Sequence, residues 1–179
     1  MSLLVVGIGD CKVSNDPSDL LVTHALGSCI GVLVYDMSAK VAGLLHYMLP
    51  EASIDAEKAR RLPYTFADTG IPLLLESVYR LGAAKSRLVV VAAGGAQMLD
   101  PNGIFNIGHR NHTAMRKIFW KAGIIVHREE VGGANSRTVS IEVGSGRMQL
   151  RTPGASVREI QLAFRRNGGS DGLQHTHRR

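Results

Sequence analysis

The sequence has few aromatic residues and only two cysteines, and each scarcity argues against a class of protein. Phe, Trp and Tyr make up 5% of the 179 residues, which leaves few rings on which nucleic acid bases could stack. The two cysteines, Cys11 and Cys29, could pair, but a protein of this size in a reducing compartment needs no disulfide. We therefore expect two free thiols and no nucleic acid partner.

Long apolar runs are also missing. No run approaches the roughly 20 residues that span a bilayer. The opening residues 1–10 lack the basic region of a signal peptide, and Gly7 and Gly9 interrupt their apolar character. We interpret this segment as a first strand and expect a cytoplasmic protein with no membrane insertion.

The charge is basic, with a formal net charge of +6. Half of this excess lies near the C-terminus, where four arginines (Arg165, Arg166, Arg178 and Arg179) face one acidic residue, Asp171. The length fits one catalytic domain, which we place at residues 1–164. The Gly, Ser, His and Arg composition of residues 165–179 cannot bury apolar surface, and it predicts a disordered basic tail.

Strand-like and helix-like segments alternate along the chain, which indicates the α/β class. The sequence predicts strands over 3–8, 20–24, 29–36, 41–47, 87–93, 124–128, 137–143 and 147–152. It predicts one helix over 71–81, capped by Asp68 or Thr69, and a second over 111–122, capped by Asn111. Residues 50–63 lack the regular apolar spacing of a strand or helix and are rich in charged residues. We therefore expect a mobile, partly helical surface segment.

Cys29 and His46 can be placed relative to each other by the parity of one predicted hairpin. A four-residue loop at residues 37–40 sets His46 opposite Gly31, with Cys29 as the diagonal neighbour on the same face. A loop centred one residue earlier would set Cys29 directly opposite His46. An odd loop without a bulge would put the two side chains on opposite faces. Gly31 leaves space that an imidazole could occupy.

A thiol beside an imidazole has two interpretations. An imidazolium can lower the pKa of a cysteine by several units and so create a nucleophile, and the turn at Gly27 and Ser28 would free backbone N–H groups for an oxyanion. The plainer interpretation is a small core cysteine and a semi-buried histidine. The spacing alone leaves both open, and Thr23 is equally open as a hydrogen-bonding residue or a plain strand residue.

Several blocks of sequence resemble the CheD family of chemoreceptor glutamine deamidases. They are residues 23–32 (THALGSCIGV), 43–50 (GLLHYMLP), 93–96 (AGGA), 106–111 (NIGHRN) and 131–133 (VGG), followed by Arg137. The blocks occur in order between about Val5 and Leu150, and only the tail lies outside them.

The resemblance implies a fold, a site and a reaction. The fold would be a layered α/β sandwich of mixed β-sheet with flanking helices, similar to the deamidase domain of the cytotoxic necrotizing factor toxins. Cys29 would be the nucleophile, His46 its base and Thr23 the third catalytic residue. Backbone groups of Gly27, Ser28 and Ile30 would hold the oxyanion. No metal or organic cofactor is needed.

The implied substrate is a glutamine side chain in the cytoplasmic domain of a methyl-accepting chemotaxis receptor. Cys29 would form a γ-glutamyl thioester and release ammonia, and water would then leave glutamate in chemotaxis adaptation. The alternative is an adaptor that binds a CheC-type phosphatase or receptor helices, with catalysis incidental. Intact Thr23, Cys29 and His46 favour the enzyme.

Other motifs favour structural roles. Residues 92–96 resemble a phosphate cradle, but they lack the spacing of nucleotide-binding loops and indicate a tight turn. The pairs His109/His112 and His175/His177 have no further ligand at suitable spacing, so we expect no metal site. Asn106, Arg110 and Asn111 are expected to hold loops around a helix start, with substrate contact as the weaker alternative. Gly132, Gly133 and Arg137 are interpreted as turn and surface.

Overall fold

The computed structural model describes residues 2–97 and 106–162. In chain order, the strands are β1 (Ser2–Val5), β2 (Asp10–Ser14), β3 (Asp19–Leu26), β4 (Ile30–Asp36), β5 (Val41–Tyr47), β6 (Leu88–Gly94), β7 (Arg128–Val131), β8 (Arg137–Glu142), β9 (Met148–Arg151) and β10 (Arg158–Glu159). The helices are α1 (Ala56–Arg61), α2 (Ala67–Arg80) and α3 (Ile107–Ala122), with short 3-10 helices η1 (Ala52–Ile54), η2 (Pro63–Thr65) and η3 (Lys85–Arg87). Within the described ranges, no helix is long and apolar enough to cross a membrane.

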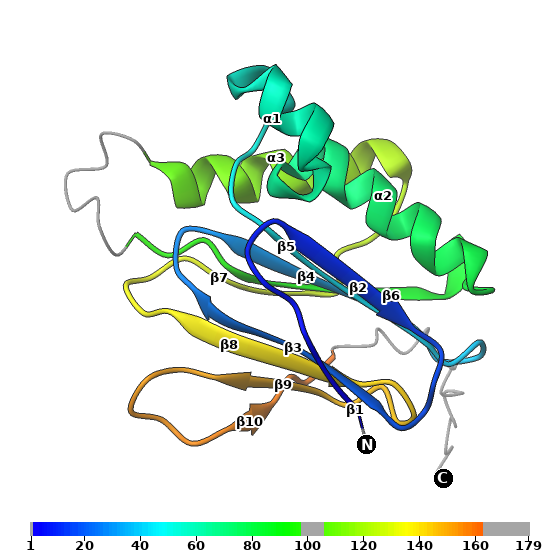
Figure 1. Cartoon of the computed structure of the whole chain (residues 1–179). Coiled ribbons are helices and arrows are strands. Elements are labelled where there is room, and N and C mark those ends of the chain that lie inside the picture. Colours follow the sequence, from blue (N-terminus) through cyan, green and yellow to red (C-terminus); the bar gives the residue numbers. More distant parts are fainter. Residues whose placement is uncertain (1, 98–105, 163–179) are drawn as a thin grey trace, which may run out of the picture.

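The elements form three layers, in which helices cover one sheet and a second sheet lies on its other face (Figure 1). The helix-covered sheet has the order β2-β5-β4-β6-β7, and the second sheet has the order β1-β3-β8-β9-β10. Each contains a parallel pair, β6 with β7 and β1 with β3, beside antiparallel pairs. The layers, the mixed sheets and the flanking helices agree with the predicted α/β sandwich.

The hairpin of β4 and β5 lies at the centre of the sandwich. All seven residues of each strand are buried. Leu45 and Tyr47 pack in the apolar cluster under the helices, whereas Leu44 packs in the cluster between the two sheets. The unbroken apolar runs of these strands are typical of a sheet covered on both faces.

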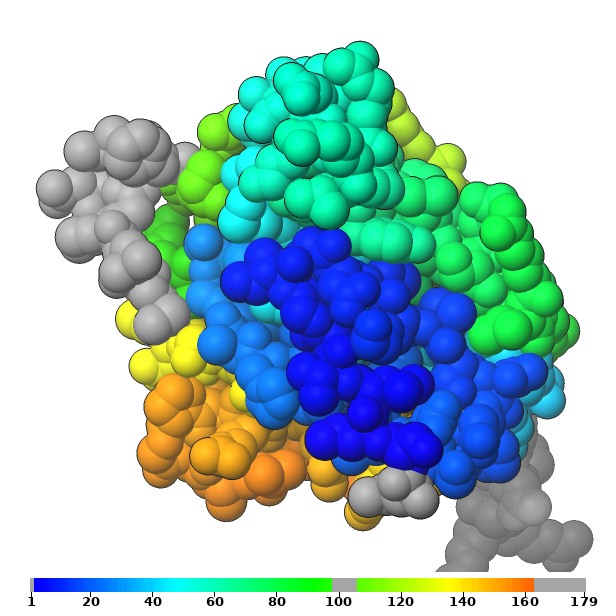
Figure 2. Space-filling view, viewed as in Figure 1, coloured from blue at the N-terminus to red at the C-terminus, as the bar shows by residue number. Residues whose placement is uncertain are grey.

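The N-terminal segment joins the two sheets at their edges. β1 is an edge strand of the second sheet, and β2 is an edge strand of the helix-covered sheet. The segment crosses one face of the molecule between them, where it appears in blue in Figure 2. The short connection between β1 and β2 therefore passes beside the end of β5, with which β2 pairs.

Three strands differ from the prediction, because β2 and β10 were not predicted and one predicted strand is displaced. No local pattern indicated β2, which alternates only weakly and is defined by its pairing with β5. The strand predicted at 124–128 lies instead at β7, because residues after α3 form a helix stop: Gly123 N–H donates to the Trp120 carbonyl, and Ile124 N–H to the Phe119 carbonyl. This is a Schellman motif, whose left-handed glycine and following apolar residue end a helix.

The helix caps were also predicted wrongly. α2 begins at Ala67, whose N–H donates to the Leu49 carbonyl at 2.9 Å, so a tertiary contact replaces a side-chain cap. Asp68 accepts instead from the N–H of Ala52. α3 begins at Ile107, which places Asn111 inside the helix and fully buried rather than at its cap.

The charged segment 50–63 is partly helical, as predicted, with η1, α1 and the start of η2. The Asp55 side chain accepts from the N–H of Lys58 and so caps α1. The mobility of the segment stays a prediction. The predicted disordered tail at 165–179 lies outside the described residues, so the division into domain and tail also stays a prediction.

Candidate active site

The β4-β5 hairpin has the register that the four-residue loop predicted. His46 pairs with Gly31, and the loop spans residues 37–40. Cys29 immediately precedes β4, one diagonal step from His46, and packs at the cluster between the two sheets. Cys29 and His46 therefore belong to one face of the hairpin, and the register with Cys29 directly opposite His46 is excluded.

Thr23 reaches the same place from the other sheet. It is fully buried on β3, and its Oγ1 lies 2.7 Å from His46 Nδ1. The pairing of β3 with β8 shifts register between Thr23 and Leu26, where Ala25 has a left-handed φ of 55°. Such bulges re-aim side chains beside functional sites. Residues 23 apart in the chain thus meet across the sandwich.

The hydrogen bonds of Thr23 determine which nitrogen of His46 carries the proton. The Thr23 hydroxyl donates to the Val6 carbonyl at 2.7 Å, and because it has one proton it must accept from His46 Nδ1. His46 is then protonated at Nδ1, which leaves a lone pair on Nε2. This nitrogen is buried and has no hydrogen-bond partner among the described residues. Nε2 is therefore available as a base.

Burial favours the neutral forms of the Cys29 thiol and the His46 imidazole. Desolvation lowers the pKa of His46 from 6.5 to about 4, and desolvation also raises the pKa of the Cys29 thiol above its usual value. The imidazolium that would lower the pKa of Cys29 stays a prediction. A neutral imidazole suits general-base catalysis, in which the proton leaves the thiol as the sulfur attacks.

Gly31 makes room in the site for side chains of the second sheet. A Cβ at this position would lie 2.9 Å from Leu26 Cδ1 and 3.4 Å from Thr23 Cγ2. Side chains of β3 therefore occupy the space nearest to Gly31. The glycine lets the second sheet approach closely enough for Thr23 to reach His46.

The end of β6 and the residues after it hold the backbone around Cys29. Gly95 N–H donates to the Cys29 carbonyl and Ala96 N–H to the Gly27 carbonyl, both at 2.8 Å. Gly94 has a φ of 113°, and a Cβ there would lie 2.2 Å from the Cys29 oxygen. Residues 92–94 are the end of β6 rather than the predicted tight turn, and the N–H groups of Gly95 and Ala96 are used within the protein.

Among the predicted oxyanion residues, the backbone arrangement favours the loop over the strand. Ile30 is already paired on both sides in the sheet, with Tyr47 and Gly94. The N–H groups of Gly27, Ser28 and Cys29 donate to no backbone carbonyl within 2–97 and 106–162. The Cys29 N–H also favours the thiolate form of its own side chain.

Sequence reasoning missed two backbone contacts of the site. The Val6 carbonyl orients Thr23, and the Gly9 N–H donates to the His46 carbonyl at 2.7 Å. Both belong to the connection between β1 and β2, whose position depends on the pairing of two edge strands. No local sequence pattern could have indicated these contacts. Asn111, in contrast, holds two loops together as predicted, through its side-chain bonds to Ser28 and Met48.

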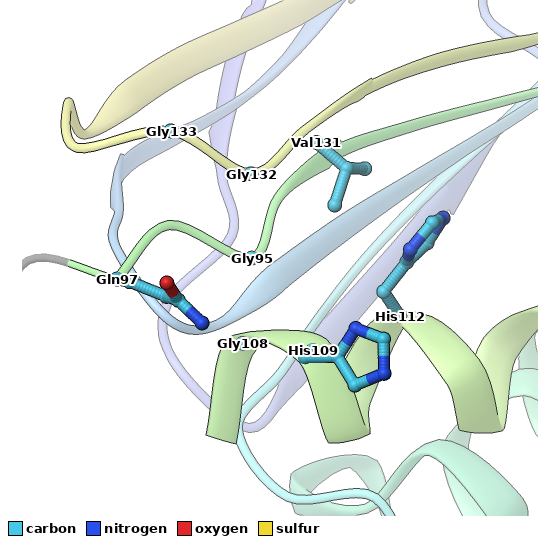
Figure 3. A pocket seen from close by; sticks show the side chains of 8 residues that line it. All are labelled: Gly95, Gln97, Gly108, His109, His112, Val131, Gly132 and Gly133. Carbon is cyan, nitrogen blue, oxygen red and sulfur yellow. The ribbon is translucent and has the colours of Figure 1, made fainter. Parts of the chain in front are cut away.

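A pocket of about 220 Å³ lies behind the turn at Gly95, where the start of α3 faces the end of β7 (Figure 3). It is lined by Gly95, Gln97, Gly108, His109, His112, Val131, Gly132 and Gly133. His112 pairs with Glu129 through Nε2 and Oε2. The part of the chain that the structure describes contains no group of three or more His, Cys, Asp or Glu residues able to hold a metal.

Arg137 and the two cysteines complete the comparison with the sequence. Arg137 is half-buried rather than a surface residue, and its guanidinium donates to the carbonyls of Gly132 and Gly94. It thereby fastens the predicted turn at Gly132 and Gly133 to the end of β6.

Both cysteines are free thiols, as predicted.

Comparison with known proteins gives a consistent result. The family model described as "CheD chemotactic sensory transduction" matches residues 48–152. A protein of Solibacter usitatus named "Probable chemoreceptor glutamine deamidase CheD" is 51% identical over 170 residues, which cover 95% of this chain and 100% of that protein. "Probable chemoreceptor glutamine deamidase CheD 1" of Syntrophus aciditrophicus is 47% identical over 160 residues, covering 89% and 100%.

One solved structure, the Neisseria meningitidis protein NMB0706, matches with a TM-score of 0.42 and 10% identity, over 74% of this chain and 63% of that chain. This likeness is too low to carry an argument. The family model, in contrast, matches more than half of the chain, and the two relatives cover 95% and 89% of it. They confirm the resemblance seen in the sequence, and the chain belongs to the CheD family.

Proposed function

We propose that this protein is a chemoreceptor glutamine deamidase, which converts receptor glutamines to glutamate in chemotaxis adaptation. The observation that carries the proposal is the hydrogen bond of 2.7 Å between Thr23 and His46. It leaves an unprotonated Nε2, with no hydrogen-bond partner among the described residues, on the face of the hairpin to which Cys29 belongs. The names of two close relatives state the same activity for those proteins.

The reaction begins with attack by Cys29 on the carboxamide carbon of the substrate glutamine. As the sulfur–carbon bond forms, Nε2 of His46 takes the thiol proton, and the carbonyl oxygen becomes an oxyanion near the N–H groups of Ser28 and Cys29. His46 then donates the proton to the nitrogen, the carbon–nitrogen bond breaks and ammonia leaves. A γ-glutamyl thioester of Cys29 remains.

Water completes the cycle. His46 takes a proton from water as the oxygen attacks the thioester carbon. The carbon–sulfur bond then breaks, His46 returns the proton to the sulfur, and glutamate leaves the regenerated Cys29 thiol. Thr23 holds the same nitrogen of His46 protonated throughout, because its own proton is committed to the Val6 carbonyl. Besides the substrate, these reaction steps need only groups of this chain and water.

Ammonia release from a purified receptor cytoplasmic domain tests this function. Wild-type protein should release ammonia, and Cys29→Ala should release none. Cys11→Ala is the matched control, because Cys11 is the other thiol and burial raises its pKa to about 12. Equal activity of wild type and Cys29→Ala would refute the catalytic assignment, and normal chemotaxis with Cys29→Ala would favour the adaptor function.

Three finer statements belong to the same proposal. The fold is related to the deamidase domain of the cytotoxic necrotizing factor toxins, the protein works in the cytoplasm, and a CheC-type phosphatase is a second candidate partner. The fold relation and the phosphatase partner rest on the sequence resemblance, and the location rests on the lack of a membrane-length apolar run and of a signal-peptide pattern.

A further inference from the structure

Asn111 holds the two strand ends that carry the proposed nucleophile and base. Its side chain is fully buried on α3. The Nδ2 group donates to the Ser28 carbonyl at 3.0 Å and to the Met48 carbonyl at 2.8 Å. Ser28 directly precedes Cys29, and Met48 lies two residues after His46. One amide group, with both of its protons used, therefore joins the backbone on either side of the site.

The contact with Ser28 determines the direction of a second group. In a trans peptide, the C=O and the following N–H point in opposite directions. The structure contains no cis peptide bond among its described residues. By holding the Ser28 carbonyl, Asn111 turns the Cys29 N–H away from α3. This N–H favours the thiolate of Cys29, and it donates to no backbone carbonyl among the described residues.

The Asn111 side chain is not explained by packing alone. Its Oδ1 is buried and has no hydrogen-bond partner among the described residues, which is an unfavourable state for a polar atom. α3 is already fastened at this point by the Tyr47 hydroxyl, which donates to the Asn111 main-chain carbonyl at 2.8 Å. What the side chain adds is a pair of hydrogen bonds that fix the directions of the Ser28 and Met48 carbonyls.

We propose that Asn111 is a positioning residue for catalysis, which orients the Ser28–Cys29 peptide so that the Cys29 N–H can stabilise the oxyanion. This inference rests on the proposed deamidase function and deepens it. Asn111 itself does not touch the substrate in this assignment. Its effect should therefore appear in the rate of the chemical step rather than in substrate binding.

The test compares two reactions of Cys29 in a Cys11→Ala background, so that only one thiol is present. Ammonia release passes through an oxyanion, whereas alkylation by iodoacetamide does not. Asn111→Leu keeps the approximate size of the side chain and removes both donors. It should lower kcat about 10²-fold, the scale of losing one oxyanion donor, while KM and the alkylation rate change less than about threefold.

Tyr47→Phe is the matched control, because it removes the other link between α3 and β5 without touching the Ser28 carbonyl. It should keep kcat within about threefold of wild type even if it lowers the melting temperature. Asn111→Asp has the same shape but an ionised carboxylate has no donors. It is the second variant if Asn111→Leu does not fold, and it should show the same loss of kcat.

The outcomes separate this inference from the function on which it rests. A folded Asn111 variant with kcat near wild type would overturn it, as would an equal loss in Tyr47→Phe. Parallel changes in kcat and alkylation rate would also overturn it, because they would indicate general loosening around Cys29. Wild-type protein that releases no ammonia would instead refute the deamidase function itself.

Discussion

At the scale of single residues, the proton of Thr23 decides the chemistry of His46. The Thr23 hydroxyl lies between an acceptor, the Val6 carbonyl, and His46 Nδ1, with 2.7 Å on each side. We expect Thr23→Val to lower kcat for ammonia release about 10²-fold, because loss of a partner that fixes the imidazole tautomer is costly in comparable sites. Thr23→Ser keeps the hydroxyl and is the control. Full activity of Thr23→Val would contradict the tautomer argument.

The sequence predicted the alignment of Cys29 and His46 because both lie in one hairpin, where the pairing follows from the loop length. Thr23 came from the family resemblance, since its position depends on a bulge and on the stacking of two sheets. Asn111 was expected to hold loops together, but its place inside α3 was missed. The helix begins at Ile107, and its first turn lies so close to the end of β6 that a Cβ at Gly108 would be only 2.5 Å from the Gly95 oxygen.

At the scale of elements, α2 lies close to β5 because Gly43 has no side chain. A Cβ at Gly43 would lie 2.7 Å from Leu74 Cδ1 and 2.9 Å from Val78 Cγ1. We expect Gly43→Ala to lower the free energy of unfolding by about 1–3 kcal/mol, the usual cost of overpacking. Urea unfolding measures this change.

Gly7→Ala is the matched control for that substitution, because a Cβ at Gly7 meets nothing within 4 Å. Its free energy of unfolding should stay within about 0.5 kcal/mol of wild type. Equal effects of the two substitutions would show that the helix does not depend on the missing side chain of Gly43.

Elements with strong local signals were predicted well, and elements defined by their partners were not. β4, β5 and β6 are apolar runs, and α3 has a regular apolar face that includes Met115 and Phe119. β2 and β7 lie at sheet edges and carry polar residues, so their sequences resemble loops. Only pairing with a neighbouring strand makes them strands.

At the scale of the whole molecule, the buried His46 makes folding sensitive to acid. The folded protein takes a proton on His46 only near pH 4, whereas an unfolded chain does so near 6.5. Between these values the unfolded state binds more protons, so the free energy of unfolding falls as the pH falls. The full difference corresponds to about 3 kcal/mol.

Urea unfolding at several pH values between 7 and 4 measures this dependence. His46→Gln cannot titrate, so its stability should fall less over the same interval than that of wild type. Identical pH dependence in the two proteins would show that His46 does not carry the acid sensitivity.

The sequence by itself determined the α/β class, the central hairpin, the common face of Cys29 and His46, and the family, because these depend on neighbours along the chain or on whole blocks of residues. Tertiary structure alone decided which nitrogen of His46 is free, that burial favours the neutral forms of the thiol and the imidazole, and how Asn111 meets Ser28. These properties depend on burial and on contacts between two sheets and a helix. The amino-acid sequence alone does not show the distances between segments that lie far apart in the chain.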